Sequence, residues 1–216
     1  EQVVADHGQV NLVINNAGVA LSGTVAGLSL DDYRWIMDIN FWGVMYGSKA
    51  FLPKLEAAGQ GHIVNISSVF GLASQPLMSG YNASKFAVRG FTESLRQDLE
   101  LTDSCVSATS VHPGGIKTNI AKAARMDRSC EQATGVDRES ATADFERLFI
   151  NSPDKAAAMI IQAVQKNKRR VLIGPDEKVF DLLVRLLHSI YPRLFTDVVR
   201  HQGLQSGQKT MRQANS

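Results

Sequence analysis

A tyrosine and a lysine four residues apart are the first groups in this chain that could move a proton. Tyr81 and Lys85 lie in a stretch of helical spacing, so their side chains share one helix face. A phenol has an ordinary pKa of about 10, which is too high for an efficient base near neutral pH. A nearby ammonium group favours the phenolate, and we therefore expect Lys85 to lower the pKa of Tyr81. Such pairs also occur on solvated helix faces, so the pair alone identifies no site.

The elements that must position this pair alternate between strands and helices. Short apolar runs predict buried strands, and apolar residues at helical spacing predict helices between them. This alternation predicts an α/β protein with a parallel sheet covered on both faces. The expected strands cover residues 10–15, 62–66, 106–111 and 170–173, and the expected helices cover 30–57, 81–101 and 153–166.

Three of the expected strands end in turns of small and polar residues. Ligands of open parallel sheets bind at the carboxyl ends of the strands, so these turns are expected to meet at one cleft. The turns are Asn15-Asn16-Ala17-Gly18, Asn65-Ile66-Ser67-Ser68 and His112-Pro113-Gly114-Gly115.

Two further polar residues stand in a fixed order before the tyrosine: Ser68, and Asn40 inside the first long helix. With them the chain resembles the short-chain dehydrogenase/reductase family from about Val10 to Gly174. The resemblance implies a Rossmann-type doubly wound parallel sheet and an oxidoreductase that uses NAD or NADP. It is carried by Asn15-Asn16-Ala17-Gly18, Asn40, Ser68, Tyr81, Lys85, Pro113-Gly114 and Thr118.

The resemblance also implies a role for each catalytic residue. Tyr81 gives a proton to a carbonyl oxygen as hydride arrives, or accepts one during alcohol oxidation, and Lys85 also binds the nicotinamide ribose. Ser68 donates a hydrogen bond to the substrate oxygen, and Asn40 holds a water in a proton relay. The structural alternatives are a turn serine and a core asparagine. Implied cofactor contacts are Asn15, Ala17, Gly18, Tyr81, Lys85, Pro113, Gly114, Ile116 and Thr118, with Asn15 alternatively tying adjacent strands together.

A glycine-rich dinucleotide fingerprint is missing from the sequence. In the family it follows the first strand, upstream of the Asn-Asn-Ala-Gly turn. We therefore expect the chain to lack the first three strands, and with them the residues that distinguish NAD from NADP. Residues 10–15 would then form an exposed apolar edge, and we expect the chain expressed alone to be poorly soluble and inactive.

The remaining segments predict the domain, its substrate and its partners. We expect a partial Rossmann domain over 1–202, with a substrate lid at 119–150, and a disordered tail at 203–216. The uncharged loop between Ser68 and Tyr81 favours an uncharged, apolar ketone, aldehyde or alcohol, although its residues could equally be ordinary packing. Residues 178–200 form an amphipathic helix with a kink at Pro192, which either packs against the protein or a partner subunit or lies on a membrane surface. Residues 30–57 and 80–101 resemble the helices through which the family forms homodimers and homotetramers.

Composition narrows the class of protein. The 216 residues suffice for one domain, and a net charge of +2 without a long basic run argues against nucleic-acid binding. Two cysteines without a histidine cluster predict neither a disulfide framework nor a metal site. We expect a cytoplasmic protein, with peripheral membrane contact as the alternative. The competing functions are a non-catalytic nucleotide-binding relative, an inactive fragment, and an epimerase or dehydratase.

Overall fold

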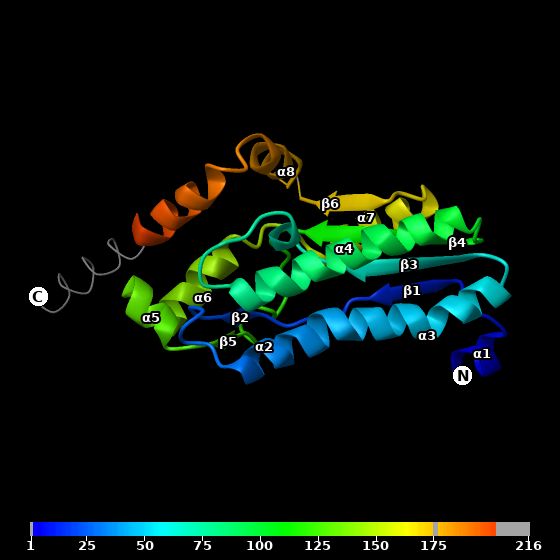
Figure 1. Ribbon diagram of the computed structural model, residues 1–216, viewed down its shortest axis with the longest axis horizontal. Helices are drawn as coiled ribbons and strands as arrows, with labels where there is room; N and C mark the ends of the chain where they lie inside the picture. Colours follow the sequence, from blue (N-terminus) through cyan, green and yellow to red (C-terminus); the bar gives the residue numbers. More distant parts are fainter. Residues whose placement is uncertain (1, 175–176, 202–216) are drawn as a thin grey trace, which may run out of the picture.

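A four-stranded parallel sheet forms the centre of the computed structural model, which describes residues 2–174 and 177–201 (Figure 1). The strands lie in the order β1-β3-β4-β6, and each neighbouring pair is parallel. All four coincide with the predicted strands to within two residues, which confirms the predicted α/β fold. Their bounds are Leu12–Asn15 for β1, Gly61–Ile66 for β3, Val106–Pro113 for β4 and Arg170–Ile173 for β6.

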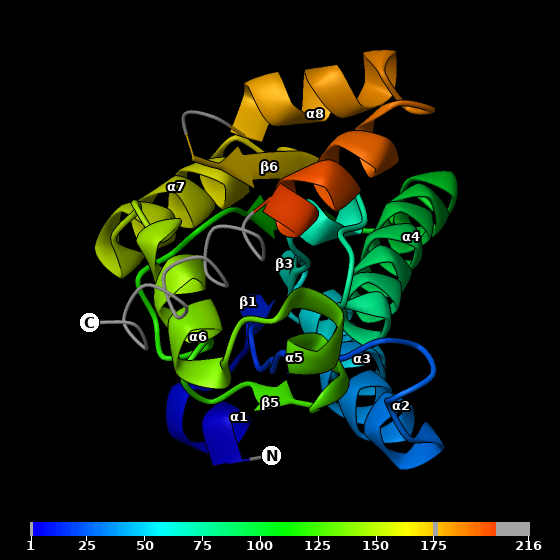
Figure 2. The ribbon, with the colours of Figure 1, turned by 90° about the vertical axis from the view of Figure 1, so that its left-hand side faces the viewer.

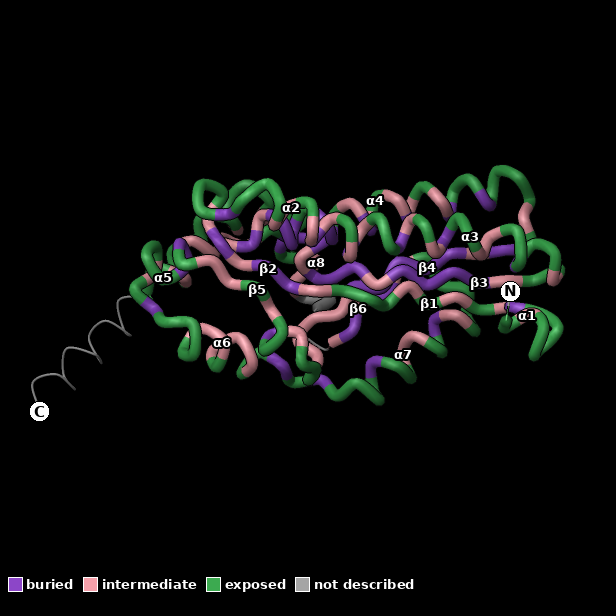
Figure 3. The backbone as a smooth tube through the Cα atoms, turned by 90° about the horizontal axis from the view of Figure 1, so that it is seen from below, coloured by how far each residue is buried: buried purple, intermediate pink, exposed green. Residues whose placement is uncertain are grey.

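Helices cover both faces of the sheet (Figures 2 and 3). Helices α3 (Gly43–Ala57) and α4 (Ser79–Leu101) lie on one face, and α7 (Pro153–Gln165) lies on the other. Successive side chains of a strand point to opposite faces, and both Ile63 and Val64 of β3 are fully buried. The sheet therefore has a hydrophobic core on each side, as expected of a doubly wound fold.

The predicted helix over 30–57 contains a π-helical turn. Helix α2 (Leu30–Met37) begins at Ser29, whose hydroxyl accepts a hydrogen bond from the backbone N–H of Asp32. The π-helix η1 (Asp38–Trp42) then joins α2 to α3. Single π turns in longer helices often mark functional positions, and this one contains Asn40.

The expected lid region folds into short elements fastened beside the sheet. It contains β5 (Arg125–Met126), α5 (Ser129–Thr134) and α6 (Arg138–Arg147). Strand β5 pairs in parallel with β2 (Leu21–Ser22), a pairing that the sequence did not predict because two residues show no periodicity. The Arg125 guanidinium lies 3.7 Å from the centroid of the Trp35 ring, which fixes the start of the lid against α2.

The two edges of the sheet differ in how they are covered. On β1, Leu12 is 37% and Ile14 is 42% exposed, which confirms the predicted apolar edge. The poor solubility expected from that edge stays a prediction. At the other edge, Arg170 of β6 pairs with Asp181 of α8 (Glu177–Leu186) at 3.3 Å. The remaining short helix, α1 (Gln2–His7), precedes β1.

The prediction of one kinked helix over 178–200 is wrong in detail. Helix α8 ends at Leu186, turns follow at 187–190, and a second helix covers 191–201. Pro192 lies in the first turn of that second helix, where its missing N–H costs nothing. Several members of the predicted apolar stripe are exposed, so the stripe is not packed against this chain: Leu183, Leu186, Ile190, Leu194 and Val198. The predicted tail at 203–216 lies outside the described residues, and none of the described helices is long and apolar enough to cross a bilayer.

Candidate active site

Tyr81 and Lys85 lie on the buried face of α4, near its first turns. Their exposed fractions are 8% and 4%, and the Lys85 Nζ lies 5.7 Å from the centroid of the Tyr81 ring. A solvated helix pair would show neither feature. The structure therefore brings the phenol and the ammonium together in an environment of low polarity, where proton transfer between buried groups responds strongly to neighbours.

The Lys85 ammonium is held at the end of β3. Its Nζ donates a hydrogen bond to the Ile66 carbonyl oxygen at 3.1 Å, and the Lys85 carbonyl accepts one from Ser67 Oγ at 2.7 Å. Burial lowers the pKa of Lys85 to about 8. An ammonium has three donors, and one of them is used within the part of the chain that the structure describes. Donors therefore remain for a ligand. Ser67 is a structural neighbour of Ser68, because its hydroxyl bonds the backbone of α4.

Tyr81 behaves differently from the prediction. Burial raises the pKa of the Tyr81 phenol above its ordinary value, and a hydrogen bond with the Ser68 side chain opposes that rise. The expected net lowering of the Tyr81 pKa is therefore wrong, because a phenolate loses its hydration in this buried position. Phe70 contributes to the apolar surroundings, with its ring edge-on to Tyr81 at 6.5 Å between centroids. The arrangement favours the neutral phenol, the form that can donate a proton.

Ser68 begins a short helical turn directly after β3. It caps the 3-10 helix η2 (Val69–Gly71), and its Oγ accepts a hydrogen bond from Phe70 N at 3.1 Å. Its carbonyl oxygen accepts from Gly71 N at 2.9 Å and makes a 2.9 Å hydrogen bond with His112 Nδ1. The hydroxyl proton is thus free to point toward Tyr81 and a substrate.

Asn40 lies fully buried in the π-helical turn, with its amide shared between two segments. Its Oδ1 accepts from Val19 N at 2.9 Å, and its Nδ2 donates to Val19 O and to Ser84 Oγ at 3.0 Å each. Ser84 in turn donates to the Tyr81 carbonyl oxygen at 2.8 Å. These bonds make Asn40 a structural link between the turn after β1 and α4. Its place in a proton relay stays a prediction.

The Asn-Asn-Ala-Gly turn follows β1 beside these groups. Asn15 Nδ2 donates to Asn65 Oδ1 at 2.7 Å, so Asn15 ties β1 to β3 as the alternative prediction stated. Ala17 and Gly18 are exposed. A side chain on Gly18 would begin 3.4 Å from Lys85 Nζ and 3.5 Å from Asn40 Oδ1. Gly18 therefore leaves space directly next to the catalytic candidates.

The turn after β4 is hydrogen-bonded to β6 and to the segment that follows the lid in the sequence. Gly114 N donates to the Ile173 carbonyl at 3.1 Å, and Ile116 forms an isolated bridge with Asn151. Thr118 is exposed. Because β4 pairs in parallel with β3, Pro113 and this turn lie at the same carboxyl end of the strands as Ser68. The predicted convergence of the three turns is confirmed, while their contacts with a cofactor stay predictions.

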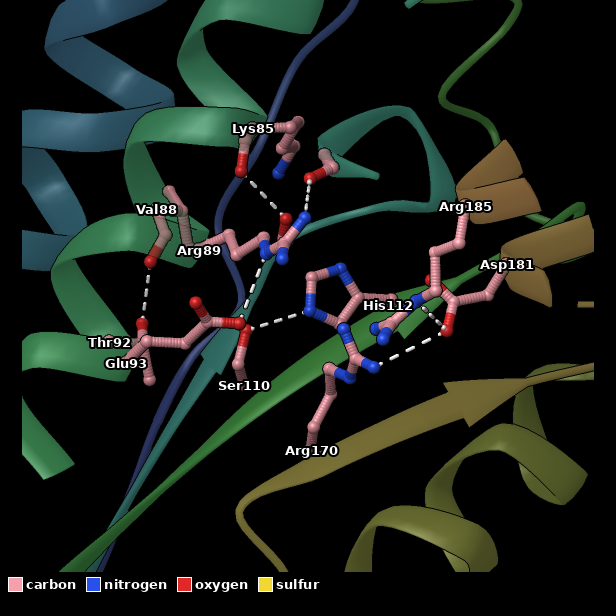
Figure 4. Close-up of polar contacts among 12 residues, drawn as sticks. Lys85, Val88, Arg89, Thr92, Glu93, Ser110, His112, Arg170, Asp181 and Arg185 are labelled. Atoms are coloured by element: carbon pink, nitrogen blue, oxygen red, sulfur yellow. Dashed lines mark hydrogen bonds and ion pairs between the residues drawn. The ribbon is translucent and has the colours of Figure 1, made fainter. Parts of the chain in front are cut away.

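Two residues in this region carried no role in the sequence analysis. His112 is fully buried and bonds Ser68, and Ser84 joins Asn40 to Tyr81. Figure 4 shows His112 between α4, with Arg89 and Glu93, and the edge strand with Arg170. The sequence analysis placed His112 in the turn after the expected strand 106–111, whereas β4 continues to Pro113 and buries the His112 ring, where polar groups need partners.

A protein-family model described as short chain dehydrogenase matches residues 1–129. The chain belongs to the short-chain dehydrogenase family. A relative from Mycobacterium tuberculosis, provisionally named the oxidoreductase SadH, is 47% identical over 195 residues, which cover 90% of this chain and 68% of the relative. A 3-alpha-(or 20-beta)-hydroxysteroid dehydrogenase of the same species is 41% identical over 118 residues, which cover 55% of this chain and 45% of that protein.

A solved structure shows the same fold. A short chain dehydrogenase/reductase from Burkholderia phymatum, crystallised in complex with NAD, superimposes with a TM-score of 0.77 at 28% identity. The match covers 88% of this chain and 70% of that one. It confirms the predicted Rossmann-type architecture of this short-chain dehydrogenase.

Proposed function

We propose that this short-chain dehydrogenase interconverts an alcohol and a ketone or aldehyde by hydride transfer with NAD or NADP, and that Tyr81 moves the proton. The observation that carries the proposal is the joint burial of the Tyr81 phenol, the Lys85 ammonium and the Ser68 hydroxyl at the carboxyl end of β3. A protein that only binds nucleotides needs no such set of proton donors.

The residues around Lys85 fit a dinucleotide. The ammonium has donors left for ribose hydroxyls, and the bare backbone of Gly18 lets a ligand approach it closely. The solved relative that binds NAD supports this assignment. When bound, NADH or NADPH supplies the hydride. The proposed contacts are those predicted from the sequence: Asn15, Ala17, Gly18, Tyr81, Lys85, Pro113, Gly114, Ile116 and Thr118.

The proton steps follow from the chemistry of the side chains. In reduction, the Tyr81 hydroxyl donates its proton to the substrate oxygen while Ser68 donates a hydrogen bond to the same oxygen, stabilising its developing charge. The raised pKa of Tyr81 keeps the phenol protonated at neutral pH for this step. In alcohol oxidation, Tyr81 must first lose its proton, and the Lys85 charge and the Ser68 hydrogen bond favour the phenolate. Asn40 would hold the water through which Lys85 exchanges protons with solvent.

The surroundings of Tyr81 favour an uncharged and apolar substrate. Its side chain packs into a cluster that includes Leu21, Met78 and partly buried Phe70 and Ile120. A charged group buried among these side chains would lose its hydration. The relative named for hydroxysteroids is consistent with a substrate of this kind.

We also propose that the protein pairs with copies of itself through α3 and α4. Large aromatic side chains are exposed along this surface: Trp42 at the end of η1 stacks on Tyr46 of α3 at 5.8 Å between ring centroids, and α4 exposes Phe86. Exposed aromatic groups of this size are typical of interfaces.

Membrane contact through residues 178–200 is the alternative proposal for that segment. It rests on the exposed side chains of Leu186 and Ile190, and flotation of the protein with liposomes tests it.

The test of the proposed reaction is the Tyr81→Phe variant of the protein expressed from its complete gene. Reduction of a panel of uncharged ketones and aldehydes is followed by the absorbance of NADH and NADPH. We expect the variant to lose about 10²- to 10⁴-fold in kcat while still binding the cofactor, because its proton donor is gone.

The matched control is Tyr33→Phe, which removes the phenolic hydroxyl that bonds Ser79 Oγ at 2.6 Å in the same apolar cluster. It should leave kcat within a few-fold of the parent. Equal turnover in the parent and the Tyr81→Phe variant would exclude the proposed proton donor. Cofactor binding without turnover on any carbonyl would favour the non-catalytic relative.

A further inference from the structure

We propose that His112 is a positioning residue that aims the Ser68 hydroxyl, acting from the neighbouring strand through the Ser68 carbonyl group. The inference rests on the proposed function, since Ser68 is the group that meets the substrate oxygen. His112 itself is fully buried on β4.

The two hydrogen bonds of His112 define which ring nitrogen carries its proton. Nδ1 lies 2.9 Å from the Ser68 carbonyl oxygen, which can only accept, so Nδ1 must be the donor. Nε2 lies 2.9 Å from Ser110 Oγ. In a neutral ring Nε2 is then the acceptor, and the Ser110 hydroxyl donates to it. The result is a directed chain from Ser110 through the imidazole to Ser68.

The surroundings of His112 keep the ring neutral. Burial lowers its pKa to about 4; nearby Arg170 and Arg89 also lower it, while the hydrogen bond to Ser68 and the charge of Glu93 act in the opposite direction. Arg89 pairs with Glu93 at 3.0 Å on α4, and Arg170 pairs with Asp181 beyond β6 (Figure 4). The chain of donors therefore keeps one direction across the pH range in which most enzymes work.

The bond from His112 ties the Ser68 carbonyl group itself to the next strand, in addition to the backbone bond from Ser67 N to Val111 O at 2.8 Å. The other bond to the Ser68 carbonyl, from Gly71 N, comes from within the same short turn and cannot fix the turn relative to the sheet. Holding the carbonyl sets the plane of the peptide after Ser68 and hence the place of Phe70 N, which bonds Ser68 Oγ. Because Phe70 N occupies one lone pair of Ser68 Oγ, the Ser68 hydroxyl proton is directed away from the turn.

His112 also precedes the turn after β4 in the chain. The next residues, Pro113 and Gly114, form the turn proposed to border the nicotinamide. One buried ring therefore links the Ser68 carbonyl group to the strand end that borders the cofactor, where the backbone bond from Ser67 N to Val111 O already joins the two strands. Misplacement by about 1 Å of a group that acts in the transition state can cost about a hundredfold in rate.

The decisive experiment is a double-mutant cycle on the protein expressed from its complete gene, with kcat for carbonyl reduction as the readout. His112→Leu removes the donor at similar volume, and we expect it to lower kcat about tenfold to a hundredfold with a small change in KM for the cofactor. In a Ser68→Ala background the same substitution should change kcat less than twofold, since no hydroxyl remains to be aimed. His112→Asn, whose Nδ2 can replace Nδ1 as donor, should recover most of the activity.

The matched control is His62→Leu, which removes another buried histidine from the adjacent strand β3. A general loss of packing would make both variants slow. An equal loss from His112→Leu with and without the Ser68 hydroxyl would overturn the inference while leaving the role of Tyr81 intact.

A readout independent of turnover tests the hydrogen bond itself. Nitrogen-15 spectra of histidine-labelled protein, assigned with the two leucine variants, should show His112 neutral at pH 6 to 7 with its proton on Nδ1. A proton on Nε2, or a charged ring, would remove the basis of the proposal even for a protein that turns over no carbonyl.

Discussion

The two ends of the central strands both contain a buried, neutral histidine, and only one of them lies near the proposed chemistry. His62 on β3 bonds Thr109 Oγ1 at 2.7 Å, and His112 on β4 bonds Ser110 Oγ at 2.9 Å. Burial lowers both pKa values to about 4. Judged by burial and pKa alone, the two positions are equivalent.

What separates the two ends is whether the polar groups are satisfied by the protein. At the amino end, Arg96 donates to the Ala108 carbonyl at 3.2 Å and to Asn167 Oδ1 at 2.8 Å, and its charge pairs with Glu100. At the carboxyl end, the buried ammonium of Lys85 keeps donors for a ligand. Perturbed pKa values thus indicate a functional site only together with unused bonding capacity.

The largest expected effect comes from removing that unsatisfied charge. Lys85→Met should lower kcat by at least about 10³-fold, because Tyr81 loses the cation that assists its proton transfer. The folded-state pKa of Lys85 lies below its ordinary value, so its buried charge destabilises the native state at neutral pH and does so less as the pH rises above about 8. The variant should therefore melt a few degrees higher at pH 7, as a thermal unfolding scan would show. A fall in melting temperature would place Lys85 with the structural groups of the amino end.

Ser68→Ala should have the next largest effect. Loss of one hydrogen-bond donor to the developing oxyanion costs about 10²- to 10³-fold in kcat, and we expect KM for the cofactor to change little. Steady-state kinetics on the best carbonyl substrate measures both values. Substitution of the neighbouring Ser67, whose hydroxyl bonds the Lys85 carbonyl, should act mainly on stability. The reverse pattern would exchange the roles of the two serines.

The pH dependence of reduction should report Lys85 and neither histidine. We expect kcat/KM to fall about tenfold per pH unit above pH about 8, where Lys85 loses its proton, and to show no limb between about pH 5 and 7, since both histidines titrate near pH 4. Lys85→Arg should move the alkaline limb to higher pH, because a guanidinium stays protonated. A limb near pH 6 in the parent would contradict the neutral state of His112.

The sequence predicted much of this arrangement because its signals are local. Apolar runs and turn residues located all four strands of the sheet, and the spacing around Tyr81 identified the residues that the structure brings together. The depth at which Tyr81 is buried depends on packing between distant segments, so the direction of its pKa was predicted wrongly. The bond between His112 and Ser68 joins residues 44 apart and leaves no periodic trace. The π turn at Asn40 escaped prediction because helical spacing continues on both sides of it.

The smallest effect on activity is expected at the amino end, from Arg96→Met. The substitution leaves the Ala108 carbonyl and the Asn167 side chain without the donor that now satisfies them, and an unsatisfied buried group costs about 1–3 kcal/mol of the free energy of unfolding. Chemical denaturation measures that loss, and kcat should stay within twofold of the parent because no bond of Arg96 reaches the Ser68 turn. A variant that folds normally yet turns over tenfold more slowly would show that the two ends of the sheet are coupled. Complete hydrogen bonding within the protein would then no longer distinguish structural polar groups from catalytic ones in this fold.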